Sequence, residues 1–354
     1  MTRADLPRQA NVSWWMEEAR ADVVILGGGY TGMWTAWFLK ERRPSLDIGL
    51  LEADAICGAG PSGRNGGFCS GMWEDLPALA RRFGDVDALR LALAAEDAVT
   101  GIRDWLAAHD VDALFALPGH LTVATSAAQD WAWAGLAEEA ERLGAEGRFV
   151  ELDAESVRAR CDSPVFRAGM LAPGGATLQP ARLALGLRRE LIARGVRIHE
   201  STPVARFAAG PPVRVETTTG ARVAADHGVL ALGAWTASIR RHHRAIVPRG
   251  TSIVLTRPVP ERLEGIGWTG GEGIGDWRTA LHCLRTTPDG RIAFGAAGSR
   301  AGLGTGLGAR LRYDERTIAA LIEDFRRFFP SWRDVGFEAA WGGPMDVTPH
   351  HVPF

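Results

Sequence analysis

The sequence predicts an α/β fold in which a discontinuous first domain carries an inserted α+β domain. Three observations support this prediction: a strand–turn–helix–strand unit at residues 22–52, a return of helix and strand patterns at residues 180–236, and a β-rich run at residues 246–296. Alternating helices and strands favour a parallel sheet, whereas consecutive strands favour an antiparallel or mixed one. We therefore expect a first domain of residues 1–84, 150–245 and 326–354, and an inserted domain of residues 85–149 and 246–325, built on a mixed or antiparallel sheet.

The first domain opens with a glycine-rich βαβ unit. Residues 22–52 read DVVILGGGYTGMWTAWFLKERRPSLDIGLLE, in which two apolar runs flank a turn and a helical pattern. Gly27, Gly29 and Gly32 give the spacing G-x-G-x-x-G, which allows a sharp turn, a close backbone approach to a pyrophosphate, and packing of helix on strand. Glu52 ends the second strand and is placed to accept hydrogen bonds from a ribose diol. This arrangement predicts a dinucleotide cofactor.

The remaining elements follow from periodicity and turn signals. Apolar residues at helical spacing predict helices at 85–109, 127–143, 180–194 and 314–328, with Asp314 as the N-cap of the last one. Strand-like runs stand at 120–125, 196–200, in a hairpin at 214–223, and in an apolar strand that ends near Gly233. Thr287-Pro288-Asp289-Gly290 is a strong turn signal inside the β-rich run.

Composition excludes several classes of protein. The chain has 354 residues and a net charge of -2, so it offers no electrostatic argument for nucleic acid or an anionic membrane. Cys57, Cys69, Cys161 and Cys283 form no metal-binding spacing, and scattered cysteines are typical of a reducing compartment. The first 15 residues lack the apolar run of a signal peptide, and no stretch is long enough for a membrane span. We expect a cytoplasmic protein with no membrane span, no nucleic-acid partner and no metal.

The segment after Glu52 narrows the cofactor. Residues 58–67 read GAGPSGRNGG, a second glycine-rich run that carries hydroxyl, guanidinium and amide groups. An extended FAD molecule requires such a loop to approach its ribityl chain and ring, whereas a nicotinamide cofactor does not. Ser62, Arg64 and Asn65 are the expected donors, and Gly63, Gly66 and Gly67 permit the close approach.

These motifs resemble the amino-acid-oxidase-like FAD-dependent oxidoreductases, which include D-amino-acid, glycine and sarcosine oxidases. The SGRNGG segment is most similar to the gamma-glutamylputrescine oxidoreductase branch. The resemblance implies a Rossmann-type FAD-binding domain and an inserted substrate domain. It also implies that Val204 contacts adenine through its backbone and that the segment LALGAWT, with Gly233 and Trp235, lies beside the flavin diphosphate. The complete set of expected cofactor residues is Gly27, Gly29, Tyr30, Thr31, Gly32, Glu52, Ala53, Ser62, Gly63, Arg64, Asn65, Gly66, Gly67, Val204, Gly233 and Trp235.

The sequence also departs from the family pattern. Members of that family continue past the motif that stops here at Pro353-Phe354, so the resemblance predicts either a fragment or an open flavin pocket. The positions that resemble covalent attachment points hold Gly343 and no histidine in residues 56–71, which predicts non-covalent FAD. Lys40 is the only lysine, so the lysine-assisted oxygen activation of the sarcosine-oxidase branch is excluded.

The resemblance implies that a primary or secondary amine, either a polyamine conjugate or an amino acid, loses a hydride to the flavin and forms an imine that hydrolyses. The electron acceptor is O2 or another carrier. We expect His120, Trp268, His282, Arg285 and Trp341 near the substrate, and we assign no catalytic base. Three alternatives remain open: a D-amino-acid or glycine-type enzyme, with Arg249 or Arg285 clamping a carboxylate; a truncated flavoprotein-like chain without activity; and an NAD-dependent dehydrogenase.

Overall fold

A computed structural model describes residues 19–278, 281–301 and 313–348 of the chain. For residues 297–301 it describes the backbone alone. The chain divides into two compact units. The first comprises Met1–Gly63 and Ala184–Thr236, and the second comprises Arg64–Leu183 and Ala237–Phe354, in both cases as far as these ranges are described. Each unit has its own sheet.

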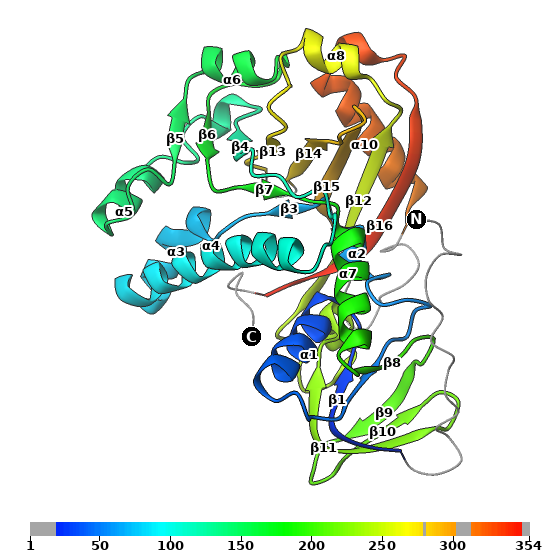
Figure 1. Ribbon diagram of the computed structural model, residues 1–354. Coiled ribbons are helices and arrows are strands. Elements are labelled where there is room, and N and C mark those ends of the chain that lie inside the picture. The colour runs from blue at the N-terminus through cyan, green and yellow to red at the C-terminus, as the bar shows by residue number, and fades with distance from the viewer. Residues whose placement is uncertain (1–18, 279–280, 302–312, 349–354) are drawn as a thin grey trace. The chain divides into compact units, whose positions relative to one another are not determined.

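The first unit contains a six-stranded sheet in the order β8-β2-β1-β11-β10-β9 (Figure 1). Its strands are β1 (Ala19–Leu26), β2 (Ile48–Leu51), β8 (Arg197–His199), β9 (Val204–Ala208), β10 (Val213–Thr217) and β11 (Arg222–Leu230). The four strands β8, β2, β1 and β11 are parallel, and β10 and β9 continue antiparallel. All four residues of β2 are buried, as expected for a central parallel strand covered on both faces. The predicted βαβ unit is therefore confirmed, with helix α1 (Tyr30–Arg42) between β1 and β2.

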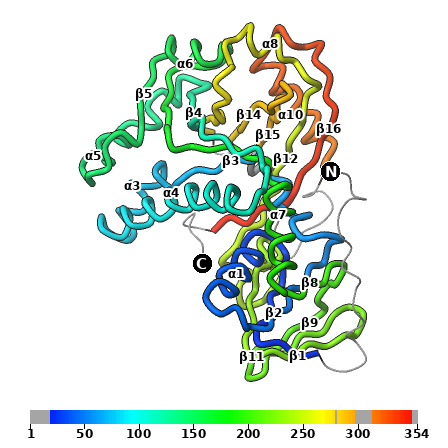
Figure 2. Tube along the Cα trace, viewed as in Figure 1, coloured from blue at the N-terminus to red at the C-terminus, as the bar shows by residue number. Residues whose placement is uncertain are grey.

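The second unit is built on an eight-stranded mixed sheet, in the order β16-β12-β15-β14-β13-β4-β6-β5. Figure 2 follows these strands along the Cα trace. Their bounds are β4 (His120–Val123), β5 (Val150–Leu152), β6 (Gly169–Ala172), β12 (Val247–Thr256), β13 (Gly273–Asp276), β14 (His282–Thr286), β15 (Ile292–Ala301) and β16 (Phe337–Val347). Among the described pairings of this sheet, β4 and β13 are parallel and the other pairs are antiparallel. A two-stranded ribbon, β3 (Phe68–Cys69) with β7 (Ala176–Thr177), belongs to the same unit.

The helices and short helical turns complete the elements. The α-helices are α2 (Pro61–Arg64), α3 (Leu76–Phe83), α4 (Asp85–Ala108), α5 (Leu136–Arg142), α6 (Ala154–Arg160), α7 (Pro180–Ala193), α8 (Pro260–Gly265) and α10 (Glu315–Phe328). The 3₁₀ turns are η1 (Trp73–Asp75), η2 (Ala127–Gln129), η3 (Gly233–Ser238) and η4 (Pro330–Trp332). Asp314 caps α10 as predicted, because its carboxylate accepts the N–H of Thr317 at 2.9 Å.

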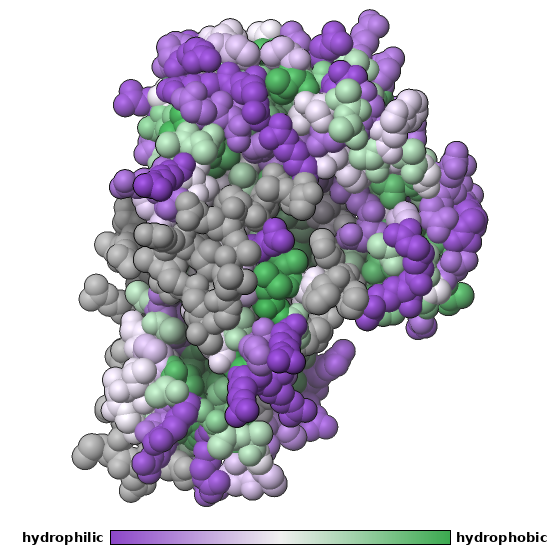
Figure 3. All heavy atoms as spheres, turned by 180° about the vertical axis from the view of Figure 1, so that it is seen from behind, coloured by the Kyte–Doolittle hydropathy of each residue, from purple (hydrophilic) through white to green (hydrophobic). Residues whose placement is uncertain are grey.

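Helix α10 covers the core of the second unit. Its buried side chains, among them Phe325 and Phe328, pack on Phe294 of β15 with ring centroids 5.6 and 5.3 Å apart. Edge-to-face aromatic contacts of this kind add to the stabilisation from burial alone. On the face shown in Figure 3, hydrophilic and hydrophobic residues are interspersed over the coloured surface.

Two sequence predictions differ from the structure. The helix predicted at 127–143 is only the seven-residue α5, because Gly135 adopts a left-handed conformation with φ of 82° and the preceding residues form turns. The compact units also differ from the predicted domain boundaries. Residues 150–172 supply β5 and β6, and residues 337–347 supply β16, which pairs along the length of β12. Both segments lie in the second unit and not with the βαβ unit.

Candidate cofactor and substrate site

The glycines of the βαβ unit are required by close backbone packing at the ends of β1 and β11. Gly27 has a φ of 108°, and a Cβ atom there would lie 2.3 Å from the carbonyl oxygen of Ala231. A Cβ on Gly32 would lie 2.0 Å from the carbonyl oxygen of Gly27, so helix α1 approaches the turn more closely than any side chain permits. Helix α1 begins at Tyr30, and its first-turn N–H groups have no acceptor within the helix. Such an N-terminus favours a bound phosphate.

Glu52 lies beside this turn. Its two carboxylate oxygens accept the N–H groups of Gly28 and Asp54, each at 2.7 Å. Burial raises the pKa of the Glu52 carboxyl above its ordinary value, and the N–H groups donated by Asp54 and Gly28 oppose that shift. A carboxylate oxygen has lone pairs for more than one hydrogen bond. The geometry therefore fixes the side chain and leaves acceptor capacity of the kind that a ribose diol needs.

Ser62 joins the following loop to the start of α1. Its hydroxyl oxygen accepts the N–H of Tyr30 at 2.8 Å. Nearby, the N–H of Cys57 donates to Glu200 at 2.7 Å, and Arg188 forms a two-bond ion pair with the same carboxylate. Sequence reasoning missed this buried pair because its partners lie on α7 and after β8, and no local motif links them. It ties the loop after β2 to the rest of the first unit.

The other expected cofactor residues of the first unit occupy loops and element ends. Val204 begins β9, directly after a segment in which Thr202 donates its N–H to the carbonyl of Glu52 at 2.7 Å. Gly233 and Trp235 lie in η3, which follows the end of β11. Ala53 is exposed, and Thr31 lies in the first turn of α1. Gly63 is the last residue of the first of the two segments that form this unit. No measurement on these residues tests their predicted contacts, which stay predictions.

The residues 64–67 belong to the second unit, where four hydrogen bonds hold them. Asn65 accepts the N–H of Gly67 at 2.8 Å, and the carbonyl of Gly67 accepts the N–H of Leu178 at 2.8 Å. Trp341 donates its indole N–H to the carbonyl of Arg64 at 2.8 Å, and Arg285 donates its Nε–H to the carbonyl of Gly66. Gly67 requires glycine, since its φ is 79° and a Cβ would meet the carbonyl oxygen of Leu178 at 2.1 Å.

The structure brings Arg285 and Trp341 together at residues 64–67, whereas Trp268 and His282 have other partners. Trp268 is 1% exposed, lies in the main hydrophobic core and donates its N–H to the carbonyl of Glu272 at 3.2 Å. His282 is 3% exposed, and its two ring nitrogens lie 2.9 Å from Asp276 and 3.0 Å from Asp324. Both positions correct the prediction, because packing and internal hydrogen bonds occupy these side chains. As described above, Arg285 and Trp341 bond to the backbone of residues 64–67.

His120 lies at the start of β4, with its ring 5.3 Å from that of Phe68. Burial lowers the pKa of the His120 imidazole, and the nearby Glu74 carboxylate opposes that shift. Its Nε2 atom is buried without a hydrogen-bond partner among the described residues. His120 also lines a cavity of about 170 Å³ together with Trp73, Glu74 and Arg148. Of the five expected substrate residues, His120 is the one that lines one of two cavities, of about 170 and 1070 Å³.

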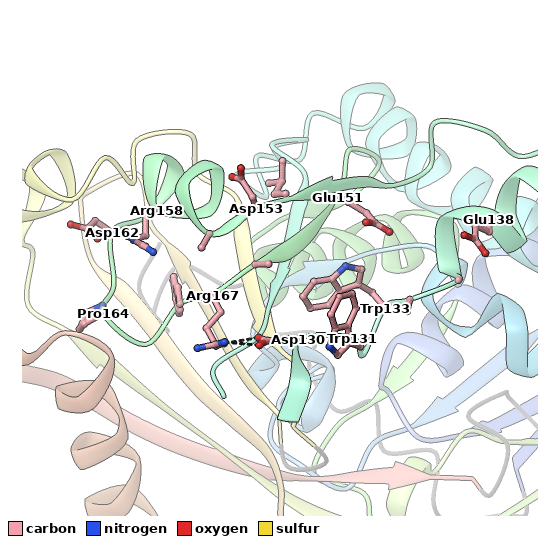
Figure 4. Close-up of a pocket in the computed structure, with 16 residues that line it drawn as sticks. Asp130, Trp131, Trp133, Glu138, Glu151, Asp153, Arg158, Asp162, Pro164 and Arg167 are labelled. Atoms are coloured by element: carbon pink, nitrogen blue, oxygen red, sulfur yellow. Dashed lines mark hydrogen bonds and ion pairs between the residues drawn. The ribbon is translucent and has the colours of Figure 1, made fainter. Parts of the chain in front are cut away.

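A larger cavity of about 1070 Å³ lies elsewhere in the second unit. Figure 4 shows Trp131 and Trp133 among the residues that line it, together with the ion pair of Arg167 with Asp130. The 16 residues that line it include none of the expected cofactor or substrate residues. Its size alone therefore does not make it the reactive site.

Comparison with known proteins identifies the family. Residues 22–354 match the family model described as FAD dependent oxidoreductase (DAO). The chain belongs to this family of FAD-dependent oxidoreductases. It is 29% identical over 344 residues to the OrdL protein of Rhizobium meliloti, described as a probable oxidoreductase, covering 95% of this chain and 75% of that protein. It is 27% identical over 340 residues to gamma-glutamylputrescine oxidoreductase of Escherichia coli, covering 95% and 76%.

Solved structures give the same fold. Glycine oxidase from Geobacillus kaustophilus matches with a TM-score of 0.75 at 20% identity, covering 95% of this chain and 85% of that one. L-proline dehydrogenase from P. horikoshii matches with a TM-score of 0.71 at 16% identity, covering 94% and 83%. The resemblance to this family and the predicted α/β fold are therefore confirmed. The protein is an enzyme of the oxidoreductase class with FAD as its cofactor, and the NAD-dependent alternative is dropped.

The residues of the first unit fit FAD. The glycine turn has the close backbone packing, the first turn of α1 after Tyr30 has the N–H groups, and Glu52 has the carboxylate that an adenine dinucleotide site requires. No group of three or more metal-binding side chains occurs among the residues with described placement. Within the same ranges, no helix is long and apolar enough to cross a bilayer. The prediction that the chain has no signal peptide depends on residues 1–15, which lie outside the described part. A cytoplasmic location therefore stays a prediction.

Proposed function

We propose that the enzyme oxidises the C–N bond of a primary or secondary amine, with FAD as the electron acceptor. Membership of the FAD-dependent oxidoreductase family over residues 22–354 carries this proposal. A curated relative that the chain resembles over 340 residues is named gamma-glutamylputrescine oxidoreductase, which supports a nitrogen-bearing donor. The carbon next to nitrogen loses a hydride, the nitrogen loses a proton, and the resulting imine reacts with water to give a carbonyl compound and the free amine or ammonia.

FAD supplies the site that takes up the two electrons of the hydride. The residues of the chain bind and orient it. The turn at Gly27 and the N-terminus of α1 hold the pyrophosphate, and Glu52 holds the adenosine ribose. Residues 64–67 contribute backbone and side-chain groups for the ribityl chain and ring. The amine must be neutral to release hydride, and no strong base is required for that step, so we assign no catalytic base.

Among amines, we propose polyamine conjugates ahead of simple D-amino acids or glycine. The 27% identity to gamma-glutamylputrescine oxidoreductase, together with the SGRNGG segment, supports this order. The glycine oxidase match supports the fold alone. We also propose that FAD is bound non-covalently, because Gly343 stands at one of the positions that resemble attachment points and the loop at residues 56–71 holds no histidine.

Anaerobic bleaching of the flavin tests the function. Purified protein loaded with FAD is mixed with gamma-glutamylputrescine, putrescine, D-alanine, glycine and sarcosine, and absorbance of the oxidised flavin is followed. The expected result is rapid bleaching by the polyamine conjugate. A quaternary ammonium analogue of that substrate is the matched control, since it has no neutral form and must leave the flavin oxidised. Bleaching by D-alanine or sarcosine alone selects the amino-acid alternative, and bound FAD that no amine bleaches selects a chain without amine-oxidising activity.

A further inference from the structure

We propose that Arg285 and Trp341 are positioning residues that hold the backbone of residues 64–67 in the conformation that FAD binds. The inference rests on the proposed cofactor role of those residues. Both side chains come from the eight-stranded sheet of the second unit, one from β14 and one from β16. They lie 219 and 277 positions along the chain from the carbonyls that they contact.

Trp341 is fixed by the sheet before it reaches the loop. It stands in β16 opposite Ile253 of β12, in one of the longest strand pairings of the molecule. Its indole N–H donates to the carbonyl of Arg64 at 2.8 Å. Because an indole nitrogen is a donor only, this bond specifies a carbonyl at one position and orientation.

Arg285 contacts a second carbonyl of the loop, that of Gly66. It stands in β14 opposite Ala293, and its Nε–H donates to the carbonyl of Gly66. A Cβ on Gly67 would lie 3.0 Å from Nε and 3.1 Å from Nη2, so the guanidinium packs directly on the Gly66–Gly67 peptide. Burial lowers the pKa of Arg285 from its ordinary value, but an arginine keeps its charge at neutral pH. The bond to Gly66 is therefore charge-assisted and strong.

These two bonds have a consequence for cofactor affinity. A loop with this many glycines has a large conformational entropy when it is not held, and ordering it at the moment of binding lowers affinity. Side chains that order the loop in advance remove part of that cost. The bond to Gly66 uses the Nε–H of Arg285, and the bond to Arg64 uses the single N–H of the Trp341 indole.

The test is titration of the FAD-free protein with FAD, followed by flavin fluorescence, alongside thermal unfolding of the same FAD-free preparations. The variants are Arg285→Met, Arg285→Lys and Trp341→Phe, which keep much of the side-chain volume. Arg291→Met, on the neighbouring strand end, and Trp131→Phe, which is 82% exposed, are the matched controls. No substrate is present, so the result is independent of whether an amine is oxidised.

We expect Arg285→Met to raise the Kd for FAD about 10- to 100-fold, as for a lost charge-assisted hydrogen bond. Trp341→Phe should raise it about 2- to 10-fold, as for a neutral one. Arg285→Lys should recover part of the loss, and the controls should leave the Kd unchanged. Should Arg285→Met fail to fold, Arg285→Lys and Trp341→Phe carry the test. Variants that unfold at lower temperature but bind FAD as tightly as the parent protein would overturn the proposal, because they would assign these side chains to stability alone.

Discussion

Replacing Glu52 by glutamine should separate its role in folding from its role in FAD binding. The side chain accepts two backbone N–H groups at 2.7 Å, one on each oxygen. A glutamine keeps one oxygen and presents an NH2 group to the other N–H, which leaves that donor without an acceptor. The stability cost is about 1–3 kcal/mol for one buried unsatisfied group.

The effect on FAD adds to that cost. A carboxylate that accepts the ribose hydroxyls makes charge-assisted bonds, and losing the charge should weaken FAD by about 1.5–3 kcal/mol, roughly 10- to 100-fold in Kd. The matched control is Asp104→Asn on α4, where the same chemical change occurs on a carboxylate that is 64% exposed. The assay is FAD titration of each folded apoprotein. Equal Kd values for Glu52→Gln and Asp104→Asn would refute the ribose role of Glu52.

The same residue gives a pH dependence with a defined sign. In the FAD-free protein, burial raises the pKa of Glu52 above its ordinary value. Ribose hydroxyls that donate to the carboxylate favour its charged form, so FAD binding should lower that pKa. By linkage, affinity is full above the pKa of the free protein and falls as the pH drops through it. The parent protein should show this loss toward acid pH, and Glu52→Gln should be insensitive over the same range.

Four further predictions follow from the described contacts. Acid precipitation should release all flavin into the supernatant, and flavin left in the pellet would contradict non-covalent binding. Gly27→Ala should lower the free energy of unfolding by about 2–4 kcal/mol, because the added Cβ meets a backbone oxygen at positive φ, whereas Gly60→Ala, which has open space, should change it little in urea denaturation. Arg188→Met should lower the free energy of unfolding by about 3 kcal/mol, because it leaves the Glu200 carboxylate without its charged partner. Arg206→Met, in an exposed ion pair, should lower it by at most about 1 kcal/mol. Similar losses would show that burial of the pair has no effect on stability. Burial lowers the pKa of His199 to about 4, so the folded state binds fewer protons than the unfolded one. The free energy of unfolding should therefore fall as the pH drops from about 6.5 toward 4. A His199→Gln variant with an unchanged pH profile would exclude this histidine as the cause.

Local signals in the sequence predicted elements of both units well. The strand at 48–51, the turn at Gly27 and the Asp314 cap depend on residues within a few positions of one another, and the structure agrees on each. Features that depend on distant pairing could not be predicted in this way. The position of β16 follows from its pairing with β12, some 90 residues away, and nothing local in residues 337–347 indicates which sheet they join.

The buried position of His282 could not be predicted for a related reason. The side chain of a strand residue can lie on either face of the sheet, and the sequence does not indicate which face meets the core. His282 points to the side covered by α10, where Asp324 of that helix and Asp276 of β13 meet its two nitrogens. The sequence showed a histidine in a β-rich run, but the carboxylates that satisfy it come from 6 positions before and 42 positions after it.

The hydrogen bond from Arg285 to Gly66 also bears on the choice of substrate. A simple amino acid carries a carboxylate on the carbon that bears the reacting amine, and bidentate recognition by arginine suits that group. The sequence named two arginines for this clamp, and the structure places the Nε–H of one of them, Arg285, on the carbonyl of Gly66. That bond uses one of the five N–H donors of Arg285, so both arginines stay candidates for the clamp; Arg249 lies in β12 between β15 and β16. Arg249→Met should leave bleaching by a polyamine conjugate within about threefold of the parent rate, since that substrate has no carboxylate at the reacting carbon. A loss of 100-fold or more with D-alanine, in a protein that polyamine conjugates do not bleach, would instead establish the clamp and the amino-acid substrate together.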